Sequence, residues 1–201
     1  KRTALTQFVS VRSTGLLAMD VNGDDELVWV RLVTGETHAM FFTRRGMAIR
    51  FPLDTIRASG RTSGGVRAIR LTEDDEGVAM DLTQDEGFVL VITTNGYGKK
   101  MAVTEFRPQG RGGQGLKAIT LSGKTGQVAD ARTLFDKDEE IALVTSDGQV
   151  MRSGCSAIRP LRRAAAGVIV MRMDKNVGLL RVARLADGRD GENSGAAGEG
   201  Q

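Results

Sequence analysis

Apolar residues along this chain fall in short runs that are rich in Val, Ile, Leu and Phe and are separated by glycine-rich or charged turns. Such runs are typical of β-strands, and no segment sustains the apolar period of 3.6 residues that would predict a helix. We expect strands at residues 27–33, 39–43, 47–51, 66–71, 78–82, 88–93, 99–103, 116–121, 128–132, 141–145, 149–152 and 168–173. Residues 1–8 and 16–21 look like the last two strands of a unit whose start is absent, and 177–184 like a closing strand.

The same pattern of positions recurs four times along the chain. Four glycines open similar segments at separations of 50, 50 and 52 residues: Gly15, Gly65, Gly115 and Gly167. Upstream of them, one apolar column holds Phe8, Ile56, Phe106 and Ile158. Equivalent hairpin turns are expected at Arg45-Gly46, Asn95-Gly96 and Asp147-Gly148. A period near fifty residues with short strands is typical of a propeller or a related array.

Charge divides the chain into two parts. The net charge is +3, but residues 186–201 carry −3, which leaves +6 on residues 1–185. The last sixteen residues are mostly Gly, Ala, Asp, Glu, Asn and Ser, a composition typical of disorder. We therefore expect a partial repeat domain over 1–185 and an acidic, glycine-rich disordered tail over 186–201. Because the chain begins inside a repeat, we expect a C-terminal piece of a longer protein.

Basic residues recur in register with the repeats. One arginine follows the upstream apolar column, and another lies four residues before each of three column glycines. Because the units are equivalent, these cations should lie at intervals along one rim. Many modest phosphate contacts can offset the bending of double-stranded DNA, which costs about 1–6 kcal/mol for a 20–30 bp site. The expected contact residues are Arg12, Arg57, Arg61, Arg67, Arg107, Arg111, Lys117, Arg159, Arg162 and Arg163.

The aromatic residues favour a duplex over single strands as the ligand. Phe8 and Phe106 share their column with isoleucines, which indicates a core position. Trp29 and Tyr97 are expected to be packing residues. A platform for single-stranded nucleic acid would need exposed rings on which the bases stack.

The segment Gln109-Gly110-Arg111-Gly112-Gly113-Gln114-Gly115 resembles a known motif. It is similar to the gyrase box of the C-terminal domains of DNA gyrase A proteins, Gln-basic-Arg-Gly-Gly-basic-Gly, at five of its seven positions. Gly110 and Gln114 stand where the family has basic residues, a form that resembles the variant box of actinobacterial gyrases. Residues 58–71, 95–100 and 104–106 are also similar to this family, and the similarity extends over nearly all of residues 1–185.

This resemblance implies an all-β fold, the β-pinwheel. It is a propeller-like disc of four-stranded blades that exchange a strand between neighbours. Roughly four blades of about 50 residues would be present here, as a partial disc. The resemblance adds the whole segment Gln109–Gly115 to the expected DNA-binding residues. It implies that the domain bends double-stranded DNA around its rim, so that the parent type IIA topoisomerase introduces negative supercoils.

The resemblance also implies what lies elsewhere in the enzyme. No catalytic, cofactor or metal site is expected in this chain, and ATP and Mg²⁺ would be used in other parts of the holoenzyme. The expected partners are the gyrase A breakage-reunion region and gyrase B, in an A2B2 complex. We expect a cytoplasmic, nucleoid-associated protein with no membrane contact.

The sequence leaves several alternatives open. The domain could be the equivalent part of topoisomerase IV, which orients DNA without strong wrapping, or a propeller-like protein-binding scaffold. Residues 110–115 also fit the dinucleotide pattern G-x-G-x-x-G, but that pattern requires a helix to begin in the loop. Residues 20–26 faintly suggest a calcium loop without its characteristic glycine and glutamate. His38 and Cys155, the only residues of their kinds, cannot form the usual zinc sets.

Overall fold

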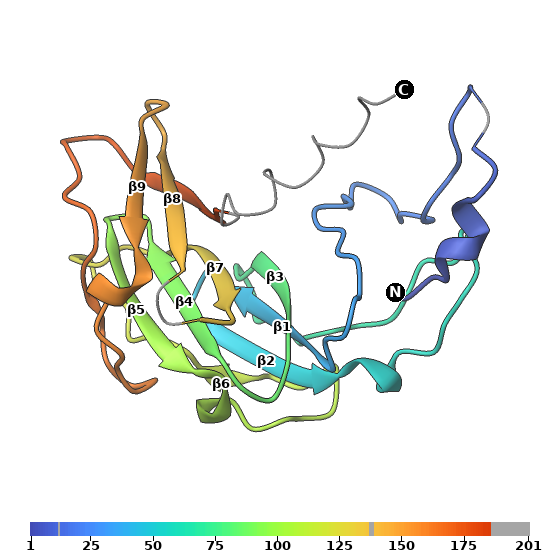
Figure 1. Ribbon diagram of the computed structural model, residues 1–201, viewed down its shortest axis with the longest axis horizontal. Coiled ribbons are helices and arrows are strands. Elements are labelled where there is room, and N and C mark those ends of the chain that lie inside the picture. The colour runs from blue at the N-terminus through green and yellow to red at the C-terminus, as the bar shows by residue number, and fades with distance from the viewer. Residues whose placement is uncertain (12, 137–138, 186–201) are drawn as a thin grey trace, which may run out of the picture.

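The computed structural model describes residues 1–11, 13–136 and 139–185, and it is built from strands and short 3₁₀ turns (Figure 1). The strands are β1 (His38–Thr43), β2 (Met47–Pro52), β3 (Gly77–Thr83), β4 (Phe88–Thr93), β5 (Tyr97–Ala102), β6 (Leu116–Lys117), β7 (Val128–Leu134), β8 (Glu140–Thr145), β9 (Val150–Gly154), β10 (Val168–Ile169) and β11 (Leu179–Arg184). The 3₁₀ turns are η1 (Leu5–Phe8), η2 (Leu53–Thr55), η3 (Val103–Glu105) and η4 (Cys155–Ala157).

The strands form three antiparallel sheets, in the orders β3-β1-β2-β6, β10-β5-β4-β7 and β11-β8-β9. Each sheet is one blade, built on the hairpin β1-β2, β4-β5 or β8-β9. The fourth strand of a blade comes from the following unit: Leu116 of β6 lies opposite Ala48 of β2, and Val168 of β10 lies opposite Gly98 of β5. The chain is therefore an all-β pinwheel in which neighbouring blades exchange a strand, as expected.

Apolar side chains hold the blades face to face. One core cluster joins the first and second blades through residues that include Met40, Phe42, Val89 and Phe106. The rings of Phe42 and Phe106 meet edge to face, with centroids 6.4 Å apart, which gives the pair a preferred geometry beyond simple burial. A second cluster joins the second and third blades through Leu90, Ile92, Leu143 and Val182, among others. The alternation of apolar positions along each hairpin thus supplies an interface on both faces of the middle blade.

Buried carboxylates tie the inner strands together. Asp81 of β3 is 4% exposed, and its Oδ2 accepts hydrogen bonds from the backbone N–H and the hydroxyl of Thr133 in β7, both at 3.0 Å. Its Oδ1 accepts from Arg31 Nε at 3.2 Å. In the same way, Asp130 of β7 accepts from the N–H of Val182 in β11 at 3.0 Å, and burial raises the pKa of that carboxyl.

Replacing Asp81 by alanine is expected to destabilise the chain by about 2–4 kcal/mol. The change leaves the backbone N–H of Thr133 without its acceptor and removes the partner of Arg31. Urea unfolding followed by circular dichroism measures the effect. Asp20→Ala removes an exposed aspartate and is the matched control. Equal stabilities of the two variants would contradict the role of Asp81 as a link between blades.

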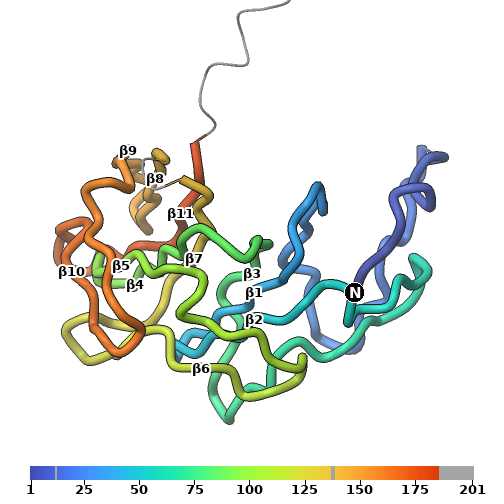
Figure 2. Tube along the Cα trace, turned by 60° about the horizontal axis from the view of Figure 1, so that its bottom comes forward, coloured from blue at the N-terminus to red at the C-terminus, as the bar shows by residue number. Residues whose placement is uncertain are grey.

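The expected strands at 1–8, 16–21, 27–33 and 66–71 are wrong. Residues 5–8 form η1, and the described residues of the other segments contain no strand, although Trp29 packs against Gly77. Figure 2 shows residues 1–11 and 13–20 beside residues 58–65 at one end of the array, where Ser59 N–H donates to Arg2 O. A strand requires a partner for its backbone groups, and no described strand pairs with residues 66–71. Side chains such as Val9 and Val30 accordingly remain 82% and 71% exposed.

The expected strands at 116–121 and 168–173 are shorter than predicted. The exchanged segment pairs over two residues in each case, as β6 and β10. Beyond them the chain turns inward, and Ala118 and Ile119 enter the core instead of continuing the ladder. The remaining expected strands, including 177–184, are present to within a few residues of their predicted bounds. The tail at 186–201 lies outside the described residues, so its disorder stays a prediction.

Candidate nucleic-acid interface

Each unit carries the same outer segment after its hairpin. A 3₁₀ turn follows the second hairpin strand, and a basic loop then leads to the column glycine that opens the exchanged strand. Figure 1 shows η1, η2, η3 and η4 spaced along the outer edge of the array, from the right-hand side to the left. We define the rim loops as residues 56–65, 106–115 and 158–167. Because they occupy equivalent places, the basic residues that they carry also recur along this edge.

A repeated backbone contact fixes where each rim loop leaves its hairpin. The N–H groups of Ser59, Gln109 and Leu161 donate to the carbonyls of Arg2, Arg50 and Lys100 at 2.9, 2.8 and 2.8 Å. The side chains of Arg50 and Lys100 are buried. Arg50 donates to the carbonyl of Phe106, in the next rim loop, and Lys100 donates to the carbonyl of Cys155, in η4. Arg50 and Lys100 therefore anchor the rim instead of forming part of its exposed surface.

The central rim loop, which contains Gln109–Gly115, is pinned to the loop before it. Gly112 N–H donates to Ala68 O at 2.7 Å, and Arg70 N–H donates to Gly113 O at 2.8 Å. Gly115 has a φ of +78°, and a Cβ there would lie 2.5 Å from Ala48 O of the neighbouring hairpin. Only glycine fits this approach. By contrast, a Cβ at Gly110 would meet nothing within 4 Å, so this position has room for a side chain.

Three arginines at one repeat position connect adjacent units. Arg61 and Arg163 each donate to the carbonyl of the residue two after the preceding column glycine, Leu17 O at 3.0 Å and Lys117 O at 3.1 Å. Arg111 reaches instead to Thr55 O at 3.4 Å. The guanidinium of Arg163 also lies 6.0 Å from the ring centre of Phe106. These hydrogen bonds use only part of each guanidinium fork, which leaves N–H groups for a further acceptor.

The structure brings most of the predicted contact residues to the surface of the rim. Arg57, Arg67, Arg107, Arg111, Lys117, Arg159 and Arg162 are exposed, and Arg61 and Arg163 are partly buried. Gln109, Gly112, Gly113 and Gly115 are partly buried, whereas Gly110 and Gln114 are exposed. Arg12 lies outside the described residues. Within the part of the chain that the structure describes, Arg162 is the member of this cationic set with a carboxylate partner, Glu105 at 3.5 Å.

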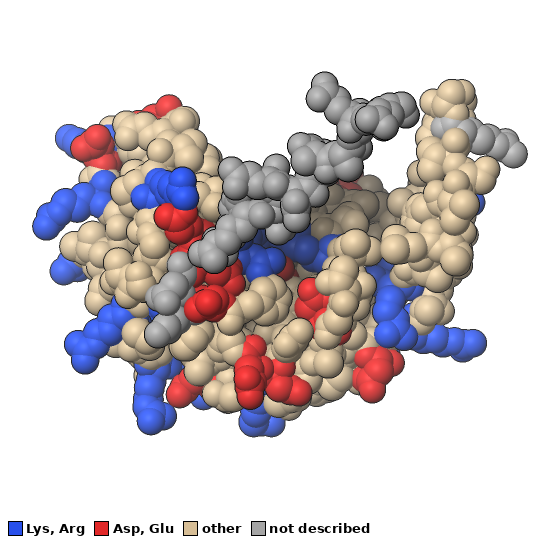
Figure 3. Space-filling model, in the orientation of Figure 1, with Lys and Arg blue, Asp and Glu red and all other residues tan. Residues whose placement is uncertain are grey.

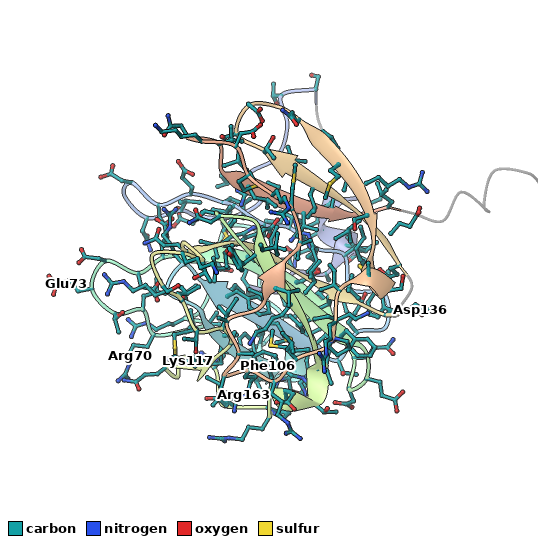
Figure 4. The ribbon with its side chains drawn as sticks, turned by 90° about the vertical axis from the view of Figure 1, so that its left-hand side faces the viewer. Arg70, Glu73, Phe106, Lys117, Asp136 and Arg163 are labelled. Carbon is teal, nitrogen blue, oxygen red and sulfur yellow. The ribbon has the colours of Figure 1, made fainter. Side chains whose placement is uncertain are left out.

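Basic side chains project from several margins of the molecule. Figure 3 shows Lys and Arg at the left, lower and right margins, with Asp and Glu among them along the lower margin and on the face between. Figure 4 places Arg70, Lys117 and Arg163 at the lower left, with Glu73 on the same side as Arg70 and Asp136 on the opposite side. Arg70 is exposed, and its backbone N–H donates to the central rim loop. The sequence did not predict it as a contact residue, because the equivalent residues of the next two units, Thr120 and Arg172, are not both basic.

Other candidate chemistry has little support in the described residues. The central rim loop is followed by strand β6, and no helix begins in it, so a dinucleotide site is excluded there. No group of three or more His, Cys, Asp and Glu residues is placed to hold a metal ion within residues 1–11, 13–136 and 139–185. Cys155 is buried, and burial raises the pKa of its thiol to about 11. No helix in this described part is long and apolar enough to span a membrane.

Solved structures share this architecture. The structure of a DNA gyrase A C-terminal domain superposes with a TM-score of 0.78 at 24% identity, covering 86% of this chain and 59% of that one. The C-terminal domain of DNA topoisomerase IV superposes with a TM-score of 0.83 at 24% identity, covering 91% of this chain and 57% of the other. At this level of identity, both comparisons establish the fold alone.

Sequence comparisons identify the family. The DNA gyrase A protein of Buchnera aphidicola is 51% identical over 187 residues, and that of Salmonella typhimurium is 39% identical over 190 residues. Each match covers 93% of this chain and 22% of the relative, so the chain spans less than a quarter of their length. The family model described as DNA gyrase C-terminal domain, beta-propeller, matches four stretches, 1–34, 37–84, 87–134 and 139–185, which follow the repeats. The chain belongs to the DNA gyrase C-terminal domain family.

Proposed function

We propose that this domain binds double-stranded DNA along the rim loops and bends it around the edge of the array. The observation that carries the proposal is the recurrence of arginine at one repeat position, Arg61, Arg111 and Arg163, on loops held in equivalent places by the contacts of residues 59, 109 and 161. Phosphates along a bent duplex recur at intervals, and equivalent guanidinium groups along an edge match such a series.

The energetics favour many weak contacts over one strong contact. Bending a 20–30 bp site by 40–90° costs about 1–6 kcal/mol, and a longer wrap costs more. Each phosphate neutralised by Lys or Arg releases condensed counterions, and the gain accumulates along the path. The flanking cations Arg57, Arg107 and Arg159, one on each rim loop, extend the contact beyond a single residue per blade.

In the parent protein, this bending would give strand passage a fixed handedness. We propose that the domain serves a gyrase A protein within an A2B2 complex with gyrase B, in the cytoplasm and on the nucleoid, and that the complex introduces negative supercoils. Catalysis, ATP and Mg²⁺ would belong to the other parts of that complex. These roles concern the whole protein. The matched relatives are more than four times as long as this chain.

The fold shared with topoisomerase IV supports a second candidate, in which the domain orients DNA without strong wrapping. The central rim loop bears on this choice, because Gly110 and Gln114 supply no charge where the gyrase box has basic residues. A protein-binding scaffold is a third possibility from a different class, and it would not require the cations to be aligned.

Gel shifts with linear duplex DNA at increasing salt distinguish binding to DNA from a scaffold role. We expect log K to fall steeply and linearly with log[salt], because the contacts are to phosphates, and longer duplexes to bind more tightly. Binding that ignores salt would contradict the proposal. Ligation of nicked plasmid in the presence of the domain then separates the two DNA-binding candidates. A wrapping domain leaves a linking-number change of one sign, and an orienting domain leaves little change.

A further inference from the structure

One of the rim loops is wrapped around a buried lysine. Lys99 in β5 is 0% exposed, although it is one of the two consecutive lysines in that strand. Its Nζ donates to three carbonyl oxygens of the rim loop 158–167: Arg162 O at 2.9 Å, Arg163 O at 2.6 Å and Ala165 O at 2.8 Å. The three N–H groups of one ammonium thus fill the inside of the loop.

The same arrangement occurs two units earlier in the repeat. Lys1 Nζ donates to Gly60 O and Ser63 O, both at 3.0 Å, and to Arg61 O. The acceptors lie five, four and two residues before the column glycine in both loops. In the rim loop between them, the equivalent residue is Ile49, whose Cδ1 would lie 3.6 Å from a Cβ at Gly113. Two rim loops therefore surround a lysine ammonium group, whereas the central rim loop packs against the apolar side chain of Ile49 through Gly113.

The ammonium determines the backbone that carries the basic side chains. Two of its three acceptors are the carbonyls of Arg162 and Arg163 themselves. Carbonyls buried inside a tight loop require donors, because a buried polar group without a hydrogen-bond partner is unfavourable. Without the ammonium, these peptide groups would turn toward water, and both arginines would move with them.

We propose that Lys99 is a positioning residue for DNA binding, which holds Arg162 and Arg163 at the rim from inside the loop without touching DNA. The inference rests on the proposed function, since it concerns the same surface. It assigns a role to a residue that lies outside the exposed cationic set. It also predicts that affinity at this blade depends on the protonation of a buried group.

The local charges make this dependence accessible near neutral pH. Burial, with Arg163 nearby, lowers the pKa of Lys99 from its ordinary 10.5 to about 8, while Glu105 acts in the opposite direction. Glu105 is also the carboxylate that pairs with Arg162. A neutral amine has only two N–H groups, so it cannot serve all three carbonyls. DNA affinity is therefore expected to fall as the pH rises from 7 to 9.

Loss of folding does not account for such a fall. Between about pH 8 and pH 10.5 the unfolded chain keeps the proton that folded Lys99 has released. Because the unfolded state then binds more protons, this group makes the free energy of unfolding rise with pH across that window. Weaker DNA binding together with unchanged or greater stability would thus indicate a change in the rim loop and not unfolding of the chain.

The decisive variant is Lys99→Met, because methionine already stands at the same repeat position in the third blade, Met151. Gel shifts with linear duplex DNA at pH 7 and pH 9 measure it against three proteins. These are the unchanged chain, the double variant Arg162→Ala with Arg163→Ala, and Lys175→Met, which removes one exposed lysine away from the rim loops. Thermal unfolding of each protein is followed by circular dichroism.

We expect Lys99→Met to weaken binding about tenfold at pH 7, near the loss in the double arginine variant, since two phosphate contacts are affected. Its affinity should no longer change between pH 7 and pH 9, whereas the unchanged chain and Lys175→Met should lose affinity across that range. Normal affinity and a normal pH profile in folded Lys99→Met, with weak binding in the arginine variant, would overturn the positioning role but leave the proposed function intact.

Two further outcomes are informative. Equal binding by all four proteins would count against the proposed function at this blade. If Lys99→Met does not fold, the unchanged chain decides the question: a pH-independent affinity from pH 7 to 9 would overturn the proposal, and a fall with retained circular dichroism would support it. Lys1→Met, measured in the same way against Arg61→Ala, tests whether the first loop obeys the same rule.

Discussion

Replacing Arg61 and Arg111 together by alanine is expected to weaken duplex binding about tenfold at physiological salt, and to do so equally for every DNA sequence. Both side chains lie on rim loops at one repeat position, and their hydrogen bonds to backbone carbonyls leave part of each guanidinium free. Because each residue would contact a phosphate, the slope of log K against log[salt] should become shallower by about two. Gel shifts with unrelated duplexes of one length measure both quantities.

The control for this experiment is a pair of arginines that carries the same charge but lies away from the rim loops. Arg44 and Arg45 lie at the turn of the first hairpin, at the far end of β2 from η2, and they pair with Glu76 and Asp74. Changing both to alanine should leave the affinity and the salt slope nearly unchanged. A loss in the Arg61 and Arg111 variant that is confined to certain sequences would contradict phosphate contact as their role.

The second large effect is expected for Gly96→Ala, which should destabilise the chain by about 3 kcal/mol or more. Gly96 has a φ of +76°, and a Cβ there would lie 2.0 Å from Met171 O. That carbonyl belongs to the segment that continues the exchanged strand β10, and Met171 N–H donates back to Gly96 O at 3.1 Å. The added methyl group would therefore push the exchanged segment away from the middle blade.

Gly148 is the matched control for this substitution. It occupies the equivalent hairpin turn of the third blade with a φ of +85°, and a Cβ there meets nothing within 4 Å. Gly148→Ala should cost only about 1–2 kcal/mol, the penalty for the left-handed conformation. Urea unfolding of both variants measures the difference. Similar losses in the two would show that the backbone conformation, and not the exchanged strand, dominates at Gly96.

The repeats made much of this fold predictable. Aligned glycines and alternating apolar residues located the three hairpins, because a hairpin depends on residues close together in the chain. Leu116 pairs with Ala48 across a long stretch of sequence, and no local pattern specifies that partner. The resemblance to a known family supplied the exchange of strands. Residues 27–33 were wrongly predicted as a strand. Their polar and apolar residues alternate, but no described strand pairs with them.

The candidate site was predictable to a similar degree. The recurrence of Arg61, Arg111 and Arg163 located the rim, because equivalent units place equivalent residues alike. The pair Lys99-Lys100 looks solvent-facing in the sequence, yet both side chains are buried, at 0% and 2% exposure. Lys99 is covered by a rim loop, and Lys100 donates to Cys155 O of η4 at 2.9 Å. Burial of a lysine depends on carbonyls brought to it by distant segments, which the local sequence does not reveal.

The donation of β6 and β10 to the preceding blades bears on how such domains change size during evolution. Within the described residues, β6 pairs with β2 and β10 pairs with β5, so both exchanges join neighbouring blades in the same way. Duplication or deletion of a whole unit in a gene would thus join a donor to an acceptor of the same design, without inventing a new interface. Lineages could in this way lengthen or shorten the curved track offered to a ligand in steps of one blade.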